Sequence, residues 1–150
     1  MKKVISVILS LIVLLVCLTS CGVDKYKDYR ATNMQARGFM AVDEDLSFKA
    51  NTVELITDYE KYTSYRFNLD YSEGFFESNN LLVFIVTSCS SDQMKYVELR
   101  EKDGRLYPLF ERNKIGENES VTTDILIYSY CVEISKEFDY EAGEIIYNYK

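Results

Sequence analysis

Four cysteines supply the most reactive side chains in this sequence of 150 residues. Cys89 and Cys131 both lie in or beside apolar runs that have the pattern of β-strands. Such a pair forms a disulfide in an oxidising compartment, but a free cysteine in an apolar strand also behaves as a small hydrophobic residue. Neither cysteine has a Cys-x-x-Cys spacing or a positively charged neighbourhood, which disfavours redox catalysis. A structural disulfide between Cys89 and Cys131 and two free thiols are therefore both left open.

Tyrosine is the second residue type of interest, because the chain has 13 of them. A tyrosine ring buries a large apolar area while its hydroxyl stays available for water or a partner, and tyrosine is enriched in binding surfaces. Four tyrosines fall close together in the sequence: Tyr59, Tyr62, Tyr65 and Tyr71. They either form a docking face for a protein or a glycan, or cover the outer edge of a sheet. The second interpretation is favoured.

Catalysis by an imidazole is excluded because the sequence has no histidine. This removes serine–histidine and cysteine–histidine hydrolases and histidine-ligated zinc or copper sites. A hydrolase with two carboxylates is still conceivable, but 24 acidic residues make that pattern uninformative. We therefore predict a protein that is not an enzyme and needs no cofactor, with a carboxylate-only hydrolase as the least favoured alternative.

The acidic segment from Asp43 to Glu54 has part of the pattern of a calcium-binding loop. Asp43, Asp45, Ser47 and Glu54 fall at the first, third, fifth and twelfth positions of such a loop. The sixth position needs glycine for its sharp turn, and here it is Phe48. A solvated turn is the better interpretation, and we predict no metal site.

The first 20 residues have the three regions of an export signal, namely a positive start, an apolar run and a small-residue end. Lys2 and Lys3 are followed by an uncharged stretch that ends at Ser20. From Val4 to Ser20 this stretch has 17 residues, slightly fewer than the roughly 20 that a helix needs to span a bilayer. A cleaved signal is therefore favoured over a permanent transmembrane helix.

The sequence Leu18-Thr19-Ser20-Cys21, followed by Gly22, resembles the lipobox of bacterial lipoproteins. The resemblance implies that the Cys21 thiol receives a diacylglyceryl group and that cleavage after Ser20 makes Cys21 the new N-terminus. Two acyl chains give a stable membrane anchor, whereas one binds only marginally. An ordinary cleaved signal and an uncleaved anchor are the alternatives.

The organisation implied by this signal is simple: a signal peptide at 1–20, a lipid-anchored flexible tether at 21–36 and one globular extracytoplasmic domain at 37–150. Removal of residues 1–20 leaves 130 residues, which suits a single domain. It also leaves 15 basic against 24 acidic residues, a net charge of about −9. So acidic a surface argues against nucleic acid and against direct adhesion to anionic lipid headgroups.

The first half of the domain contains the predicted helices. A weak strand pair is expected at 39–42 and 46–48. Thr57 and Glu60 have the spacing of a capping box, which predicts a short helix to about Phe67. One more helical turn is expected within 72–77.

The second half contains the predicted strands. Residues 81–87 are apolar on both faces and predict a central strand. Asp103-Gly104 joins two runs, 94–101 and 105–112, in the strongest short hairpin signal. Pro108 cannot donate a ladder hydrogen bond, so its strand is expected at an edge or bulged there.

The last elements complete a small β-domain. Residues 121–134 alternate in the manner of a strand, and 145–149 form a final strand. The predicted core face of the long strand is Leu126, Tyr128, Tyr130, Val132 and Ile134. The predicted fold is mainly β with one or two short helices, packed as a small antiparallel sandwich or half-barrel.

This order of elements, over about 57–136, resembles small cell-surface proteins and lipoproteins of Gram-positive bacteria whose function is unassigned. More distantly, it resembles the C-terminal domain of the protease-complex lipoprotein family, a small β-fold. That family's Gly-Gly-Tyr element after the core strand is replaced here by Ser90-Ser91-Asp92. The matching features are Thr57-Asp58-Tyr59-Glu60, the run from Tyr71 to Phe76, the strand from Leu81 to Val86, the hairpin, and the late strand from Asp124 to Ile134.

The functional expectation is a protein anchored to the cell membrane on its extracytoplasmic side through lipid on Cys21. It is expected to act by binding, as an interaction module with an envelope protein as partner. The alternative is a small-ligand or peptide-binding domain, including a protease inhibitor. The sequence does not distinguish a Gram-positive surface from a periplasmic face.

Overall fold

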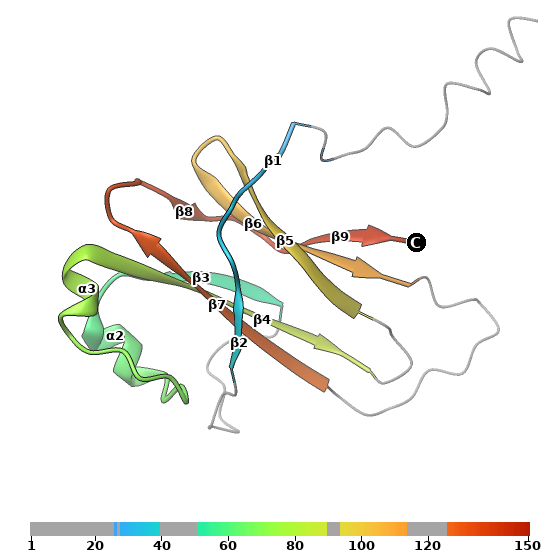
Figure 1. Ribbon diagram of the computed structural model, residues 1–150. Helices are drawn as coiled ribbons and strands as arrows, with labels where there is room; N and C mark the ends of the chain where they lie inside the picture. The colour runs from blue at the N-terminus through green and yellow to red at the C-terminus, as the bar shows by residue number, and fades with distance from the viewer. Residues whose placement is uncertain (1–25, 27, 40–50, 90–93, 114–125) are drawn as a thin grey trace, which may run out of the picture.

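The fold is mainly β with two short helices, arranged as two sheets that, over the described residues, do not close into a barrel (Figure 1). The fold class predicted from the sequence is therefore confirmed. The signal peptide at 1–20 and the lipidation site Cys21 lie outside the described part of the chain, as do residues 40–48 of the expected strand pair, so these stay predictions. The computed structural model describes residues 26, 28–39, 51–89, 94–113 and 126–150.

The first sheet is built around a long hairpin. Its strand order is β1-β5-β6, and both β8 and β9 lie along the other side of β6. The β5–β6 pairing is antiparallel, whereas β8 and β9 run parallel to β6, which the predicted antiparallel sandwich did not include. The strands are β1 (Arg30–Ala31), β5 (Met94–Lys102), β6 (Arg105–Arg112), β8 (Glu141–Ala142) and β9 (Ile146–Tyr149).

The second sheet is antiparallel and has the order β2-β7-β4-β3. Its central strand β4 pairs with β3 on one side and with the whole of β7 on the other. The predicted central strand at 81–87 is thus confirmed. The strands are β2 (Arg37–Phe39), β3 (Thr52–Ile56), β4 (Asn79–Ser88) and β7 (Leu126–Ser135).

The two sheets face each other and enclose a cluster that we call the intersheet core. Every member is at most 2% exposed. Because side chains alternate along a strand, β4 sends every second residue into this core and the others to its opposite face. This explains why its sequence is apolar throughout. The members are Leu82, Phe84, Val86, Leu99, Leu106, Phe110, Val132 and Ile134.

The hairpin has the geometry that its sequence predicts. Asp103 and Gly104 both have positive φ, 52° and 74°, as a two-residue turn between twisted strands requires. Pairing runs from Lys102 opposite Arg105 to Met94 opposite Arg112.

Pro108 does not lie at a sheet edge, contrary to the prediction. Strand β6 is flanked by β5 on one side and by β8 and β9 on the other. Pairing with β8 ends at Leu106 and pairing with β9 begins at Leu109, so Pro108 falls in the break between them. The β-bulge lies nearby but in the partner strand, between Tyr96 and Glu98. A residue without an N–H fits where no strand pairs with it on that side.

Two short helices precede the central strand. Helix α2 (Tyr59–Ser64) is capped by Asp58, whose side chain accepts from the Lys61 N–H at 2.8 Å. The cap is one residue later than the predicted Thr57, and the helix ends before Phe67. Helix α3 (Phe75–Ser78) is the helical turn expected within 72–77. Within the described ranges, neither of these helices nor any other is long and apolar enough to cross a membrane.

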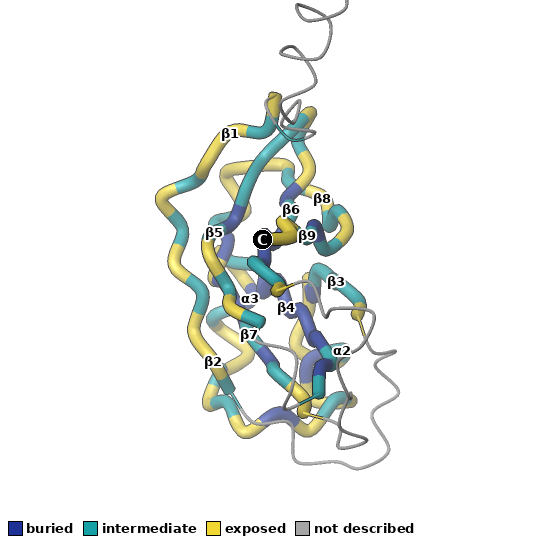
Figure 2. The backbone as a smooth tube through the Cα atoms, turned by 90° about the vertical axis from the view of Figure 1, so that its right-hand side faces the viewer, coloured by how far each residue is buried: buried dark blue, intermediate teal, exposed yellow. Residues whose placement is uncertain are grey.

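The N-terminal segment joins the fold earlier than expected. Residues Arg30 and Ala31 form β1 and pair with Glu101 and Arg100 of β5. Figure 2 shows the chain then crossing along one side of the molecule from β1 in the first sheet to β2 in the second. Arg30 and Ala31, which fall within the predicted tether at 21–36, are therefore paired with the domain through the β1–β5 ladder.

Candidate functional site

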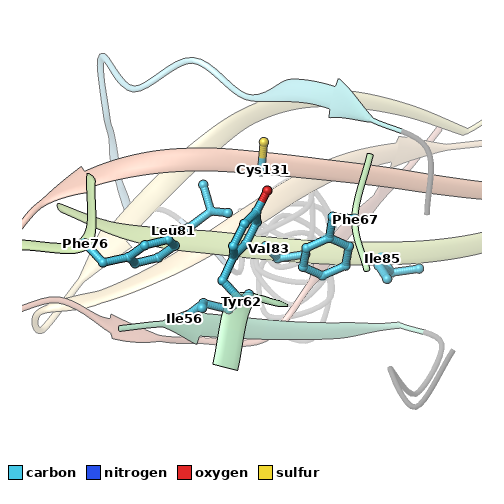
Figure 3. Packing of buried hydrophobic residues seen from close by; sticks show 8 residues of the cluster. All are labelled: Ile56, Tyr62, Phe67, Phe76, Leu81, Val83, Ile85 and Cys131. Atoms are coloured by element: carbon cyan, nitrogen blue, oxygen red, sulfur yellow. The ribbon is translucent and has the colours of Figure 1, made fainter. Parts of the chain in front are cut away.

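The four predicted tyrosines gather on the outer face of the second sheet. We call this region the tyrosine layer; it consists of Tyr59, Tyr62, Tyr65 and Tyr71 with the phenylalanines around them. Tyr62 is at its centre and only 6% exposed, packed between Phe76 and Phe67 (Figure 3). The sheet side of the cluster is formed by Ile56, Leu81, Val83, Ile85 and Cys131.

The hydroxyl of Tyr65 is held by a carboxylate on the sheet. It lies 3.0 and 3.1 Å from the two carboxylate oxygens of Glu54 in β3. Lys61 of α2 forms an ion pair with the same carboxylate. The arrangement fixes α2 and the turn after it to the edge strand, because one carboxylate binds both.

Tyr71 makes the matching contact on the same face of the sheet, with Glu133 of β7. Its hydroxyl donates to Glu133 Oε1 at 2.8 Å and accepts from the Arg37 guanidinium at 3.1 Å. Arg37 lies opposite Cys131 in the β2–β7 ladder, so a thiol lies beside this network. Burial raises the pKa of the Cys131 thiol above its ordinary value, and Arg37 and Tyr71 offset only part of that rise. A protonated, buried thiol is a poor nucleophile.

Burial and the carboxylates also keep the tyrosines neutral. Burial, assisted by the hydrogen bond to Glu54, raises the pKa of Tyr65 to about 12. Burial and the hydrogen bond to Glu133 raise the pKa of Tyr71 still further. Burial raises the pKa of Tyr62, whose hydroxyl donates to the Leu69 carbonyl. These hydroxyls therefore act as structural donors and not as acid–base groups.

The tyrosines cover the outer face of the second sheet, whereas the favoured interpretation of the sequence placed them at its outer edge. Tyr62 belongs to the core, and Tyr65 and Tyr71 are half-buried with their hydroxyls bonded inside the fold. Only Tyr59 reaches the surface substantially, at 36% exposed. A docking face made of all four tyrosines would have to break these internal contacts.

The two cysteines of the domain do not form the disulfide that the sequence left open. Neither thiol forms a disulfide; Cys131 is buried and Cys89 is partly exposed. Cys131 lies opposite Val83 in β4, and Cys89 is six positions further along the chain, which is about 20 Å along a strand. The Cα atoms of a disulfide lie within about 7 Å of each other. The strand register therefore keeps the pair apart.

The acids do not assemble a metal site in the described residues. No group of three side chains from histidine, cysteine, aspartate and glutamate is placed to hold an ion there. Residues 43–48 of the segment that has part of the calcium-loop pattern lie outside the described part of the chain. The carboxylate of Glu54 accepts a hydrogen bond from Tyr65 and forms an ion pair with Lys61.

A surface hollow lies at the edge of the second sheet, where β2 meets β7. We call it the edge groove; its volume is about 310 Å³. Ile127, which lines it, is 50% exposed, and Leu126, the preceding residue on the opposite face of β7, is 36% exposed, although both are large aliphatic residues. Strand alternation predicted Leu126 on the core face, which is wrong. The lining residues are Gly38, Phe39, Ile127, Tyr128, Ser129 and Tyr130.

Sequence reasoning missed this groove because it depends on how far the sheets overlap. Alternation correctly puts Tyr130, Val132 and Ile134 on the intersheet face. At the beginning of β7, however, the same face passes beyond the core and Leu126 becomes exposed. The groove could have been recognised from the aliphatic run at 125–127. This run puts apolar side chains on both faces of the strand at its end, where the core does not cover them.

A second hollow lies beside the bulge of β5. It measures about 570 Å³ and lies between the crossing segment 32–36 and residues 96–98. The hydroxyl of Tyr96 is buried and has no hydrogen-bond partner among the described residues. Burial raises the pKa of Tyr96 to about 12.

No family model, curated protein or solved structure matches this chain. The resemblance to small Gram-positive lipoproteins thus remains a prediction from the sequence.

Proposed function

We propose that this protein is a lipid-anchored interaction module on the extracytoplasmic side of the cell membrane. The two lysines at the start, the apolar run and the Leu18–Cys21 sequence support export and acylation of Cys21. Two acyl chains would hold the domain stably at the bilayer. The hydroxyls of Tyr62, Tyr65 and Tyr71 are bonded internally, which favours a binding role for another surface of the domain.

The proposed contact surface is the edge groove. The observation that carries it is Ile127, a large aliphatic residue that is 50% exposed and lines the groove together with Phe39 and Tyr128, because a hollow lined by exposed apolar side chains is typical of a binding site. The groove's 310 Å³ is at the lower limit of small-molecule pockets, which span roughly 300–1,000 Å³. It suits one or two apolar side chains of a protein partner better than a whole small molecule. The occupant we propose is an apolar segment of another envelope protein.

The interaction is tested by co-isolation from cells that carry the anchored protein. Ile127→Ser should abolish recovery of a partner that the unchanged protein captures. Tyr149→Ser is the matched control, because Tyr149 is equally exposed, at 52%, but belongs to the other sheet. Equal recovery with both variants would reject the groove as the contact surface.

The anchor is tested separately with a clickable palmitate analogue supplied to growing cells. Cys21→Ser should remove the label and release the protein from the membrane fraction. Cys17→Ser serves as the control, because Cys17 lies within the predicted signal peptide and should not change the labelling. Labelling that persists in Cys21→Ser would contradict the lipoprotein assignment.

Small-peptide binding is the second candidate, favoured by the unpaired Tyr96 hydroxyl next to the larger hollow. A ligand that supplies an acceptor would satisfy this buried donor, whose desolvation otherwise costs about 1–3 kcal/mol. A thermal-shift screen with pools of short peptides should then find one that stabilises the unchanged protein and not Tyr96→Phe. A screen without such a difference would remove this candidate.

A further inference from the structure

The segment that follows the predicted anchor is fastened to the outer face of the first sheet. The Tyr29 ring packs edge-on against Tyr107 of β6, with centroids 4.9 Å apart at 76°. On its other sides, Tyr29 contacts Tyr26, at 5.3 Å, and the ammonium of Lys102, 4.8 Å from the ring centroid. Tyr29 is therefore held between aromatic and cationic groups near the tip of the β5–β6 hairpin.

Backbone and charge contacts continue this attachment. Arg30 pairs with Glu101 in the ladder and forms an ion pair with its carboxylate at 2.6 Å. The Thr32 N–H donates to the Leu99 carbonyl at 2.9 Å, and the Arg100 guanidinium donates to the Tyr26 carbonyl at 3.4 Å. We call residues 26–32 the strap, because they join the N-terminus to β5 at several points.

The position of the strap limits how far the domain can lie from a lipid on Cys21. Five peptide units separate Cys21 from Tyr26, and a fully extended chain covers at most about 17 Å over that length. Strand β6 runs from Arg105 at the hairpin tip to Arg112, which is about 23 Å. The intervening chain is thus shorter than β6, so a lipid on Cys21 lies within reach of the hairpin tip but cannot reach the far end of the strand.

From these lengths we infer that the hairpin end, the end of the domain with the Asp103–Gly104 turn, faces the lipid bilayer, while the edge groove points away from it. The inference rests on the proposed anchor and adds an orientation to it. Figure 1 shows β1 and the β5–β6 turn at one end of the molecule and the beginning of β7, where Leu126 and Ile127 lie, at the other. The groove is then presented to partners in the envelope, and the bilayer does not cover it.

Two exposed aromatic residues offer matched positions for a distance measurement. Phe138 follows β7 and neighbours Asp139, which lines a surface hollow with Gly104 at the hairpin end. Tyr149 lies opposite Arg112 at the far end of β6. They are 51% and 52% exposed, so replacing either by azidophenylalanine and attaching a donor dye disturbs the fold little and to a similar degree.

Energy transfer is then measured from each position to acceptor-labelled headgroups in vesicles that carry the full acylated chain. Transfer from position 138 should exceed transfer from position 149 severalfold. Vesicle-bound protein with equal or reversed transfer would overturn the orientation and leave the anchor standing. Protein that does not bind vesicles would instead overturn the proposed anchor and the orientation with it.

The strap itself is tested by loosening it. The double variant Tyr29→Ser with Arg30→Ser removes the ring contacts and the ion pair, which lengthens the free chain and should reduce the difference between the two positions. Tyr59→Ser, on the far side of the second sheet, is the control and should leave the difference unchanged. An undiminished difference in the double variant would contradict the role of the strap.

Discussion

The intersheet core and the tyrosine layer lie on opposite faces of β4 and are closed in different ways. The intersheet core is covered by a second sheet and consists of aliphatic and phenylalanine side chains that are at most 2% exposed. Among the described residues, the tyrosine layer is covered by α2, α3, the chain between them and Phe39. Its rings are fastened to the sheet through hydroxyl contacts with Glu54 and Glu133.

The difference shows how a small domain can cover a sheet without a second sheet. A tyrosine that is half-buried contributes apolar area with its ring and directional hydrogen bonding with its hydroxyl. Two carboxylates, one on β3 and one on β7, place the rings at each side of the layer. The abundance of tyrosine in 59–71 thus has a structural explanation and does not require a ligand.

The largest expected effect is the loss of stability when a buried ring is removed, which should differ between the intersheet core and the tyrosine layer. Phe84→Ala in the intersheet core should lower the free energy of unfolding by about 3–5 kcal/mol, because the surrounding core relaxes only partially into the cavity. Phe75→Ala, at the partly buried margin of the tyrosine layer, should lower it by about 1–2 kcal/mol. Urea denaturation measures both. Equal losses would show that the tyrosine layer is packed as firmly as the core.

The hydroxyl contacts should contribute the next largest effect. Tyr65→Phe and Tyr71→Phe remove the hydrogen bonds to Glu54 and Glu133 and should each lower the free energy of unfolding by about 1 kcal/mol. Tyr59→Phe is the matched control, since the exposed Tyr59 should change stability by less than about 0.5 kcal/mol. If all three variants behave alike, the carboxylates do not hold the layer.

Alkaline pH offers a graded test of the same contacts. The pKa of Tyr65 is raised from 10.0 to about 12 in the folded protein. A raised pKa stabilises the fold fully below the unfolded value, so this contribution should be lost as the pH rises from 10 towards 12. Glu54→Gln, which removes the carboxylate's share of the shift, should reduce this loss. The free energy of unfolding of the unchanged protein and of Glu54→Gln is measured from pH 8 to 12. An identical pH dependence in the two proteins would contradict the prediction.

Thiol accessibility is the smallest predicted difference. Cys89 is partly exposed and should react with a maleimide in the folded protein, whereas Cys131 should react only after unfolding. Mass spectrometry of protein unfolded without a reductant should find both residues labelled. Absence of label from both would indicate the disulfide that the strand register opposes.

Local sequence signals predicted the parts of the fold that depend on local chemistry. The Asp103-Gly104 turn, the doubly apolar strand β4 and the two short helices require only neighbouring residues, and all are confirmed. The parallel pairing of β8 and β9 with β6 was not foreseen. It depends on where the chain returns after β7, which no neighbouring residue specifies.

The candidate sites were harder to predict because they depend on contacts between distant strands. The sequence indicated that the tyrosines cluster, but the partners of Tyr65 and Tyr71 are Glu54 and Glu133, 11 and 62 positions away. Strand alternation alone could not reveal that Leu126 extends past the core. The separation of Cys89 from Cys131 likewise follows only from the β4–β7 register.

Site-specific photocrosslinking in cells tests the central claim most directly, namely that the tyrosine layer is structural and that the edge groove is the contact surface. Benzoylphenylalanine is placed at position 127 or at position 59 of the full anchored chain, because Ile127 and Tyr59 are the large apolar residues that each region exposes. The account predicts a discrete crosslinked partner from position 127 and none from position 59. A partner captured from position 59 and not from position 127 would contradict it and return the binding role to the tyrosines.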